Sequence, residues 1–239
     1  QLAFRYVYYG AFAPNTARAK VAFTSTRILT GMQYVLETWP IFVPIAAAVV
    51  GLIALGVWRA DACRRRLTML AGVICVWVVY VAIIGGDYHA AHRHMVPIFG
   101  LTALAAAEVL SGCGRSRQIA CWGATAVIAG VYFTGQIWDP ALRKANRERW
   151  EYRAIALGRT LRAAFEDEQP LLAVTAAGAL PFTTGFPCVD MLGLNDKWLA
   201  THRPGSFGKG PIGHELGNAE YIINRAPDLI TFEPAGVTV

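Results

Sequence analysis

An acid and a guanidinium lie close together between two apolar segments. The stretch Gly85-Gly86-Asp87-Tyr88 is followed by Arg93 and Pro97, with apolar runs on both sides. Charges held where membrane-type helices end are costly unless they pair or engage a ligand. Asp87 and Arg93 are therefore candidate residues of a functional site. An ion pair that only orders the loop is an alternative of about equal weight.

Three of the five histidines, His89, His92 and His94, stand in the same loop as Asp87. Imidazole together with carboxylate suits Zn²⁺ or Mn²⁺. This keeps open a metal site and a divalent cofactor, Mg²⁺ or Mn²⁺. The spacing matches no standard zinc pattern, which favours the alternative of interfacial histidines that contact lipid headgroups.

Cations and tyrosines alternate near the start of the sequence. The candidate residues are Arg5, Tyr8, Tyr9, Asn15 and Lys20. Such side chains could clamp a phosphate and stack on a sugar. An aromatic belt with basic side chains reaching the membrane surface is at least as well supported by composition.

Three polar residues of the C-terminal part are candidates for substrate binding. Asp190 follows a predicted strand, Asp196 precedes a predicted helix, and His214 stands in the turn Gly213-His214-Glu215. The carboxyl ends of strands in α/β sheets are where ligands bind. The structural alternatives are an N-cap at Asn195 or Asp196 and an ordinary turn at His214.

The elements that would position these residues are mainly membrane helices. The 239 residues are 55% hydrophobic and only 16% charged, which is too apolar for an ordinary soluble domain. Four windows approach the length of about 20 apolar residues that a membrane helix needs: Pro40–Trp58, Leu67–Gly85, Met95–Ser111 and Ile119–Trp138. Val21–Thr38 has a helical period with charges, which predicts an interfacial helix.

The positions of arginine predict the orientation. Arg59 and Arg64–Arg66 crowd the first connection, and Arg115 and Arg117 the third, so both are expected to be cytoplasmic. The Asp87 loop and the part after Trp138 are then outside. The arginines flank apolar runs instead of lining one polar face, so no nucleic-acid partner is expected.

The part after Trp138 has the pattern of a small α/β domain. Trp150–Phe165 has an amphipathic helical period, and Leu171–Thr175, Cys188–Met191 and Leu229–Phe232 read as strands. The predicted fold is thus a polytopic α-helical membrane protein with a small C-terminal periplasmic α/β domain. The expected domains are an external juxtamembrane segment (1–39), a four-helix transmembrane region (40–138) and the α/β domain (139–239).

Known catalytic motifs are absent from the sequence. It has no P-loop, GxSxG, HExxH or GxGxxG after a strand, which removes support for nucleotide chemistry and serine hydrolysis. The five cysteines have no CxxC or metal-type spacing. The start at Gln1, without an initiator Met or a signal peptide, leads us to expect a C-terminal part of a longer protein.

Several motifs in order resemble the bacterial GT-C glycosyltransferases, which include the protein O-mannosyltransferases, aminoarabinose transferases and terminal arabinofuranosyltransferases. The matching residues are Arg5-x-x-Tyr8-Tyr9-Gly10, Pro14-Asn15-Thr16-x-x-x-Lys20, Gly85-Gly86-Asp87 with Arg93 and Pro97, Gly178-Ala179-Leu180-Pro181-Phe182, Asp190-Met191-x-Gly193-Leu194-x-Asp196, Gly213-His214-Glu215 and Pro227-Asp228-Leu229-Ile230. They span nearly the whole chain.

The resemblance implies a multi-pass transferase of the bacterial inner (plasma) membrane. It would move a sugar from a polyprenyl-phosphate donor to a glycan, lipid or protein acceptor of the cell envelope at the outer face. Asp87 and Arg93 would line the donor cavity, with Arg93 on the phosphate and the N-terminal residues beside them. The catalytic acid would lie upstream of Gln1, so no catalytic residue is assigned. The rival hypothesis is a non-enzymatic transport or assembly component with an external binding domain.

Overall fold

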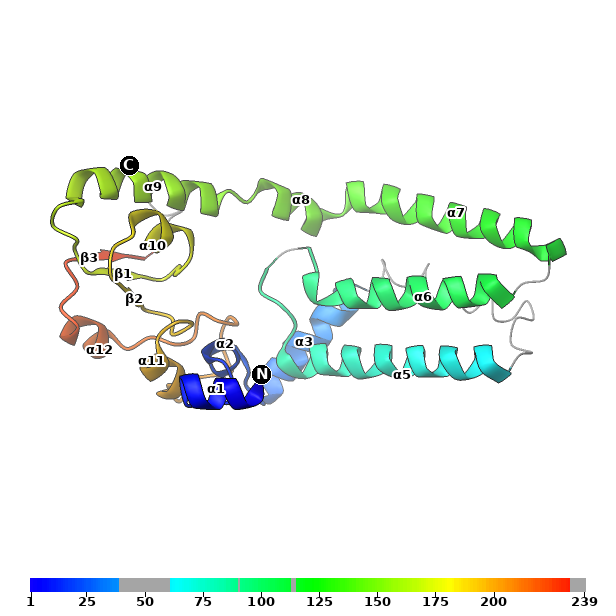
Figure 1. The fold of residues 1–239 in the computed structure, drawn as a ribbon, viewed down its shortest axis with the longest axis horizontal. Coiled ribbons are helices and arrows are strands. Elements are labelled where there is room, and N and C mark those ends of the chain that lie inside the picture. Colours follow the sequence, from blue (N-terminus) through cyan, green and yellow to red (C-terminus); the bar gives the residue numbers. More distant parts are fainter. Residues whose placement is uncertain (39–60, 90, 113–114, 233–239) are drawn as a thin grey trace. The chain divides into compact units, whose positions relative to one another are not determined.

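The computed structural model describes residues 1–38, 61–89, 91–112 and 115–232 (Figure 1). The chain divides into two compact units. One, the hairpin unit, is Ser25–Arg147, and the other, the sheet unit, combines Gln1–Thr24 with Glu148–Val239. The sequence did not suggest that the first 24 residues group with the C-terminal part.

The described part of the hairpin unit contains helices and loops. In chain order, its described helices are α3 (Ser25–Glu37), α5 (Asp61–Ile84), the short 3-10 helix η2 (Arg93–Met95), α6 (Val96–Gly112), α7 (Arg115–Trp138) and α8 (Pro140–Arg147). With 24 residues and a rise of about 1.5 Å per residue, α5 is about 36 Å long, enough to cross a bilayer core.

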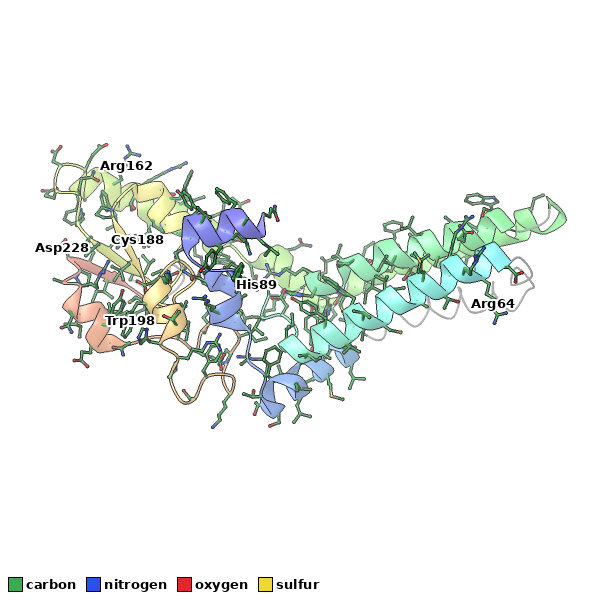
Figure 2. All side chains as sticks on the ribbon, turned by 60° about the horizontal axis from the view of Figure 1, so that its bottom comes forward. Arg64, His89, Arg162, Cys188, Trp198 and Asp228 are labelled. Atoms are coloured by element: carbon green, nitrogen blue, oxygen red, sulfur yellow. The ribbon has the colours of Figure 1, made fainter. Side chains whose placement is uncertain are left out.

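Helices α5 and α6 form an antiparallel hairpin. Cys63 and Leu67 near the start of α5 pack against Ala105 and Val109 near the end of α6. At the other end, a second cluster joins Val81 of α5 to Tyr34, Met95 and Ile98. In Figure 2, Arg64 and His89 mark the opposite ends of this hairpin. Tyr34 belongs to α3, which therefore packs at the His89 end.

The outer surface of the hairpin is apolar. Large side chains such as Met69 and Val76 of α5 and Leu104 of α6 are more than half exposed. In water this exposure would be unfavourable, whereas a bilayer would accept it. Among the described residues, two helical stretches are long and apolar enough to cross a membrane, Cys63–Ile84 and Arg93–Ser111.

These two stretches correspond to the predicted windows Leu67–Gly85 and Met95–Ser111. The window Ile119–Trp138 lies within the single helix α7, although α7 is not one of the two stretches. The window Pro40–Trp58 lies outside the described residues. The predicted helix Val21–Thr38 is confirmed as α3, with a later start at Ser25.

The sheet unit is an α/β domain. It contains α1 (Leu2–Tyr9), α2 (Asn15–Lys20), α9 (Trp150–Phe165), β1 (Leu172–Val174), α10 (Ala179–Thr184), β2 (Cys188–Asp190), α11 (Lys197–Thr201), α12 (Ala219–Asn224) and β3 (Leu229–Thr231). The strands form a parallel sheet in the order β2-β1-β3. The predicted helix Trp150–Phe165 and the three predicted strands are confirmed.

Helices cover both faces of this sheet (Figure 1). Successive side chains of a strand point to opposite faces, so Leu172 and Val174 pack with α9 and α10. Ala173 points the other way, into a cluster with Leu199 of α11 and Ile222 of α12. The central strand β1 is buried throughout, as expected for a parallel sheet covered on two sides.

Candidate functional site

The candidate site lies at the His89 end of the α5–α6 hairpin, where the loop 85–95 meets α3. Gly85 and Gly86 begin this loop with φ of +93° and +75°. A Cβ on Gly85 would lie 2.2 Å from Cδ of Arg27, and a Cβ on Gly86 would lie 2.5 Å from Cγ of Tyr34. The two glycines are thus required both by their backbone conformation and by the close approach of α3.

Asp87 and Arg93 form a two-point ion pair across the loop. The guanidinium donates to both carboxylate oxygens, from Nε to Oδ2 and from Nη2 to Oδ1, the second at 3.0 Å. The Asp87 side chain is 6% exposed, whereas that of Arg93 is 53% exposed. The acid is therefore the inner, fixed partner, and the guanidinium faces outward.

Further contacts hold the Asp87 carboxylate. The amide of His89 donates to Oδ1 at 3.3 Å, and Nε2 of His94 lies 3.8 Å from Oδ2. Burial alone would raise the pKa of Asp87, but the Arg93 and His89 hydrogen bonds and the nearby charges hold this pKa below its ordinary 3.8. Asp87 is thus an anion at neutral pH.

Helix α3 contributes two buried polar residues to this end of the hairpin. Arg27 is 2% exposed and Tyr34 is 8% exposed. Burial raises the pKa of Tyr34 to about 12, and the Asp87 charge adds to the rise. The Tyr34 phenol is therefore neutral, and within the described residues its buried oxygen has no hydrogen bond of normal geometry.

The sequence did not single out Arg27 and Tyr34 as site residues. The usable signal was their spacing, because residues seven apart lie on one face of a helix. The second signal was that Arg27 is the one cation of α3. Neither signal indicates which loop that face will meet.

The segment before η2 has an uncommon backbone. Ala91 and His92 have φ of +69° and +48°, a region that side chains with a Cβ rarely adopt. The His92 ring contacts the Tyr34 ring edge to face, with centroids 5.5 Å apart, and its buried Nδ1 has no partner among the described residues. Strained backbone of this kind clusters at active sites and ligand clamps, although Gln169 and Ala226, near helix ends, also have a positive φ.

The three loop histidines take separate positions. Among the described residues, no group of three or more His, Cys, Asp or Glu could hold a metal ion. His92 packs on Tyr34, His94 faces Asp87, and the backbone oxygen of His94 accepts from Nε1 of Trp77 at 2.6 Å. The described geometry therefore lends no support to the metal site considered from spacing.

A second arginine–carboxylate pair lies at the opposite end of the same hairpin. Nη1 of Arg66 donates to both oxygens of Glu108 at 3.1 Å. Here the Arg66 side chain is 64% exposed and that of Glu108 is 19% exposed. This pair has similar chemistry without buried polar neighbours from α3, which makes it a useful control.

The other predicted site residues belong to the sheet unit. Arg5 donates to the Phe12 carbonyl at 3.3 Å, and Tyr8 and Tyr9 are exposed on α1. Asn15 begins α2, and Lys20 ends it beside Gly213. Asp87 and Arg93 are thus brought together by one loop, while the N-terminal candidates form part of a different unit.

Asp190 and Asp196 have structural partners. Asp190, 3% exposed, accepts from the amides of Leu192 at 2.9 Å and Asn195 at 2.7 Å, which closes the turn after β2. Burial raises the pKa of Asp190, although these hydrogen bonds oppose the rise. Asp196 is the N-cap of α11, as the structural alternative predicted.

The Asp196 carboxylate also orients an aromatic stack. It accepts from the Tyr221 hydroxyl at 2.9 Å. The Trp198 ring lies between those of Tyr221 and His202, with centroids 4.1 Å away on each side, and Figure 2 labels it. Both faces of Trp198 are therefore covered. His214 is exposed in its turn, with Nδ1 3.2 Å from the Ile212 carbonyl oxygen.

Comparison with known proteins identifies one family of unassigned role. Residues 140–237 match the family described as a domain of unknown function, DUF8728. This range covers α8 and the C-terminal part of the sheet unit, and it excludes Asp87 and Arg93. No curated protein and no solved structure matches the chain.

Proposed function

We propose that this chain is part of a membrane-embedded transferase that takes a sugar from a polyprenyl-phosphate donor and passes it to a cell-envelope acceptor. One observation carries the proposal. Arg93 is held at two points by the buried carboxylate of Asp87, and half of its own side chain is exposed at the end of a membrane-length hairpin. This arrangement suits the phosphate of a lipid whose chain lies in the bilayer.

The chemistry requires an anion clamp of this kind. In the transfer, the bond between the anomeric carbon and the phosphate oxygen breaks, and an acceptor hydroxyl oxygen forms the new bond to that carbon. The polyprenyl phosphate leaves with the negative charge, and the acceptor proton passes to a base. A guanidinium has five N–H donors, and Asp87 uses two of them, which leaves donors for the departing phosphate.

The proposal includes a membrane topology. Four helices cross the bilayer, the arginine-rich first and third connections are cytoplasmic, and the Asp87 loop and the C-terminal domain lie outside. The apolar surface of α5 and α6 supports the insertion of these two helices, and the orientation rests on the arginine pattern alone. The donor clamp is argued from Asp87 and Arg93 alone, which both lie in the hairpin unit, whereas Arg5, Tyr8, Tyr9, Asn15 and Lys20 belong to the sheet unit.

The test compares the two arginine–carboxylate pairs of the hairpin. The chain in nanodiscs is titrated with polyprenyl phosphate, and the longer protein that includes the expected catalytic acid is assayed for transfer from lipid-linked sugars. Arg93→Ala should weaken phosphate binding about tenfold or more, because a charge-assisted hydrogen bond contributes about 1.5–3 kcal/mol. Arg93→Lys should bind phosphate with an affinity between those of the wild type and Arg93→Ala, since lysine keeps the charge but lacks the planar, two-pronged guanidinium. Arg66→Ala should bind like the wild type.

Two results would change the proposal. If Arg93→Ala and Arg66→Ala both bind and transfer like the wild type, the clamp is wrong. If Arg93→Ala loses binding but the longer protein that includes the expected catalytic acid transfers no sugar, the rival function, a non-enzymatic transport or assembly component that binds lipid phosphates, is favoured.

A further inference from the structure

The first helix of the sheet unit exposes an unusual amount of aromatic surface. In and just after α1, seven large apolar side chains are more than half exposed: Leu2, Phe4, Tyr6, Val7, Tyr8, Tyr9 and Phe12. No residue of α1 is buried. Exposed large apolar side chains gathered on one short helix are a mark of an interaction surface.

The exposed rings form two contacting groups. Phe4 stacks on Tyr8 with centroids 5.3 Å apart, and Tyr8 meets Tyr9 edge to face at 4.7 Å. Tyr6 and Phe12 form a second stacked pair at 4.8 Å. The rings of each group therefore pack against one another, and these side chains stay more than half exposed and accessible to a partner.

The N-terminal segment is also anchored to a basic part of the same unit. Nη2 of Arg203 donates to the Arg18 carbonyl at 2.6 Å, and the Thr24 hydroxyl donates to the Gly208 carbonyl at 2.6 Å. Nζ of Lys197 approaches the Tyr9 carbonyl at 3.4 Å. We call residues 1–24 together with 197–217 the aromatic–basic region.

Charge is segregated within the sheet unit. The aromatic–basic region contains six Lys or Arg residues and one acid: Arg5, Arg18, Lys20, Lys197, Arg203, Lys209 and Glu215. Glu215 accepts from the amides of Gly208 at 2.8 Å and Gly210 at 2.7 Å, so its charge is engaged locally. The rest of the unit, 148–196 and 218–239, contains ten acids and five bases.

We infer that the aromatic–basic region lies on the surface of the bilayer and binds anionic phospholipid headgroups. Tyrosine and phenylalanine on a short amphipathic helix favour the headgroup boundary, and neighbouring cations add attraction to anionic lipids. A hydroxyl-rich glycan would instead favour carboxylate acceptors beside the rings, and residues 1–24 contain no acid. The inference rests on the proposed membrane location.

The experiment uses fluorescent labels on the full chain in nanodiscs. Single cysteines replace Val7, Val76 or Phe182 in a background whose five native cysteines are changed to serine. Val7, in α1, is 84% exposed. Val76, in α5, is 71% exposed and reports the membrane location, and Phe182, in α10 of the sheet unit, is 91% exposed and is the control. Doxyl groups near the headgroup or deep in the acyl chain quench the label.

The label at position 7 should lose about half of its emission to the shallow quencher, as expected for a group about 5–10 Å into the headgroup boundary. Position 76 should respond to the deep quencher, and position 182 to neither. Quenching at position 7 should be stronger with anionic lipids and decrease several-fold at an ionic strength of about 1 M, where the Debye length is about 3 Å. Lys209→Glu should also weaken the quenching at position 7, because it replaces a cation with an anion.

The outcomes separate the inference from the proposed function. Quenching at position 76 without quenching at position 7 overturns the inference and keeps the membrane location. An absence of quenching at position 76 would contradict both the inference and the proposed membrane location. A label at position 7 that responds to added envelope glycan but not to doxyl lipid would assign α1 to acceptor binding, which also overturns the inference. Tyr8→Cys provides a second labelling position if Val7→Cys fails to fold.

Discussion

At the scale of single residues, Asp87 organises the candidate site. Its carboxylate is almost completely enclosed, and it receives hydrogen bonds from Arg93 and from the His89 amide. Removing one partner of such a pair leaves the other charge uncompensated, so Asp87 and Arg93 should be treated as one unit. The sequence predicted this pair, because only six positions separate the two residues and a short loop keeps them close.

The Asp87 charge predicts a stability change at acidic pH. A carboxyl whose folded pKa lies below its ordinary 3.8 stabilises the fold above that pH, and the contribution is lost as the pH falls through the folded pKa. The melting temperature of the wild type should exceed that of Asp87→Asn at neutral pH, and the difference should shrink below about pH 4. Thermal melting in detergent from neutral pH to pH 3 measures this.

The matched control is Asp167→Asn, in the exposed turn after α9, which should melt like the wild type at each pH. A difference between the wild type and Asp87→Asn that stays constant down to pH 3 would show that the Asp87 charge does not stabilise the fold.

At the scale of elements, close packing of α3 against α5 positions Arg27 and Tyr34. The contact point is Gly31, where an added Cβ would lie 2.1 Å from the carbonyl oxygen of Ala82. Small residues allow helix backbones to approach closely, in membranes above all. The sequence predicted α3 from its helical period and α5 from the length of its apolar run, but not their crossing, because these signals describe one helix and not its partner.

Gly31→Ala should therefore separate α3 from α5 and lower the melting temperature, although alanine is the better helix former by about 1 kcal/mol. The same change at Gly72, in the middle of α5, meets nothing within 4 Å and should be neutral or slightly stabilising. Melting curves of the two variants check the prediction. Equal melting temperatures would contradict the packing of α3 on α5.

At the scale of the whole molecule, a segment from the start of the chain completes a domain at its end. Ala19 is fully buried and Ala22 is 5% exposed in the sheet unit. A Cβ on Gly208 would lie 2.7 Å from Cβ of Ala22, so the loop 203–217 follows the N-terminal segment closely. The family match 140–237 therefore does not cover all of the sheet unit.

Deleting residues 1–24 should loosen the loop 203–217 and leave the sheet folded. Amide hydrogen exchange at Gly208 and Gly210 should become faster, because the contacts from Ala22 and Thr24 that support the loop are lost. Exchange in the central strand β1 should stay slow and is the internal control. Unchanged exchange at Gly208 would contradict the assignment of residues 1–24 to this unit.

By itself, the sequence determined the local features of this protein. The helices α3, α5, α6 and α9, the three strands and the Asp87–Arg93 pair all follow from periodicity, length or short separation along the chain. These depend on neighbouring residues, so a single sequence carries the signal.

Only the tertiary structure decided which distant residues meet. Arg27 and Tyr34 reach the glycines 85 and 86, and residues 1–24 join the loop 203–217 almost two hundred positions later. Which helix face meets which loop depends on the shape of all packed side chains together, and many pairings satisfy the same hydrophobic pattern. For that reason the sequence could indicate the ion pair at the hairpin end but not the α3 residues packed behind it.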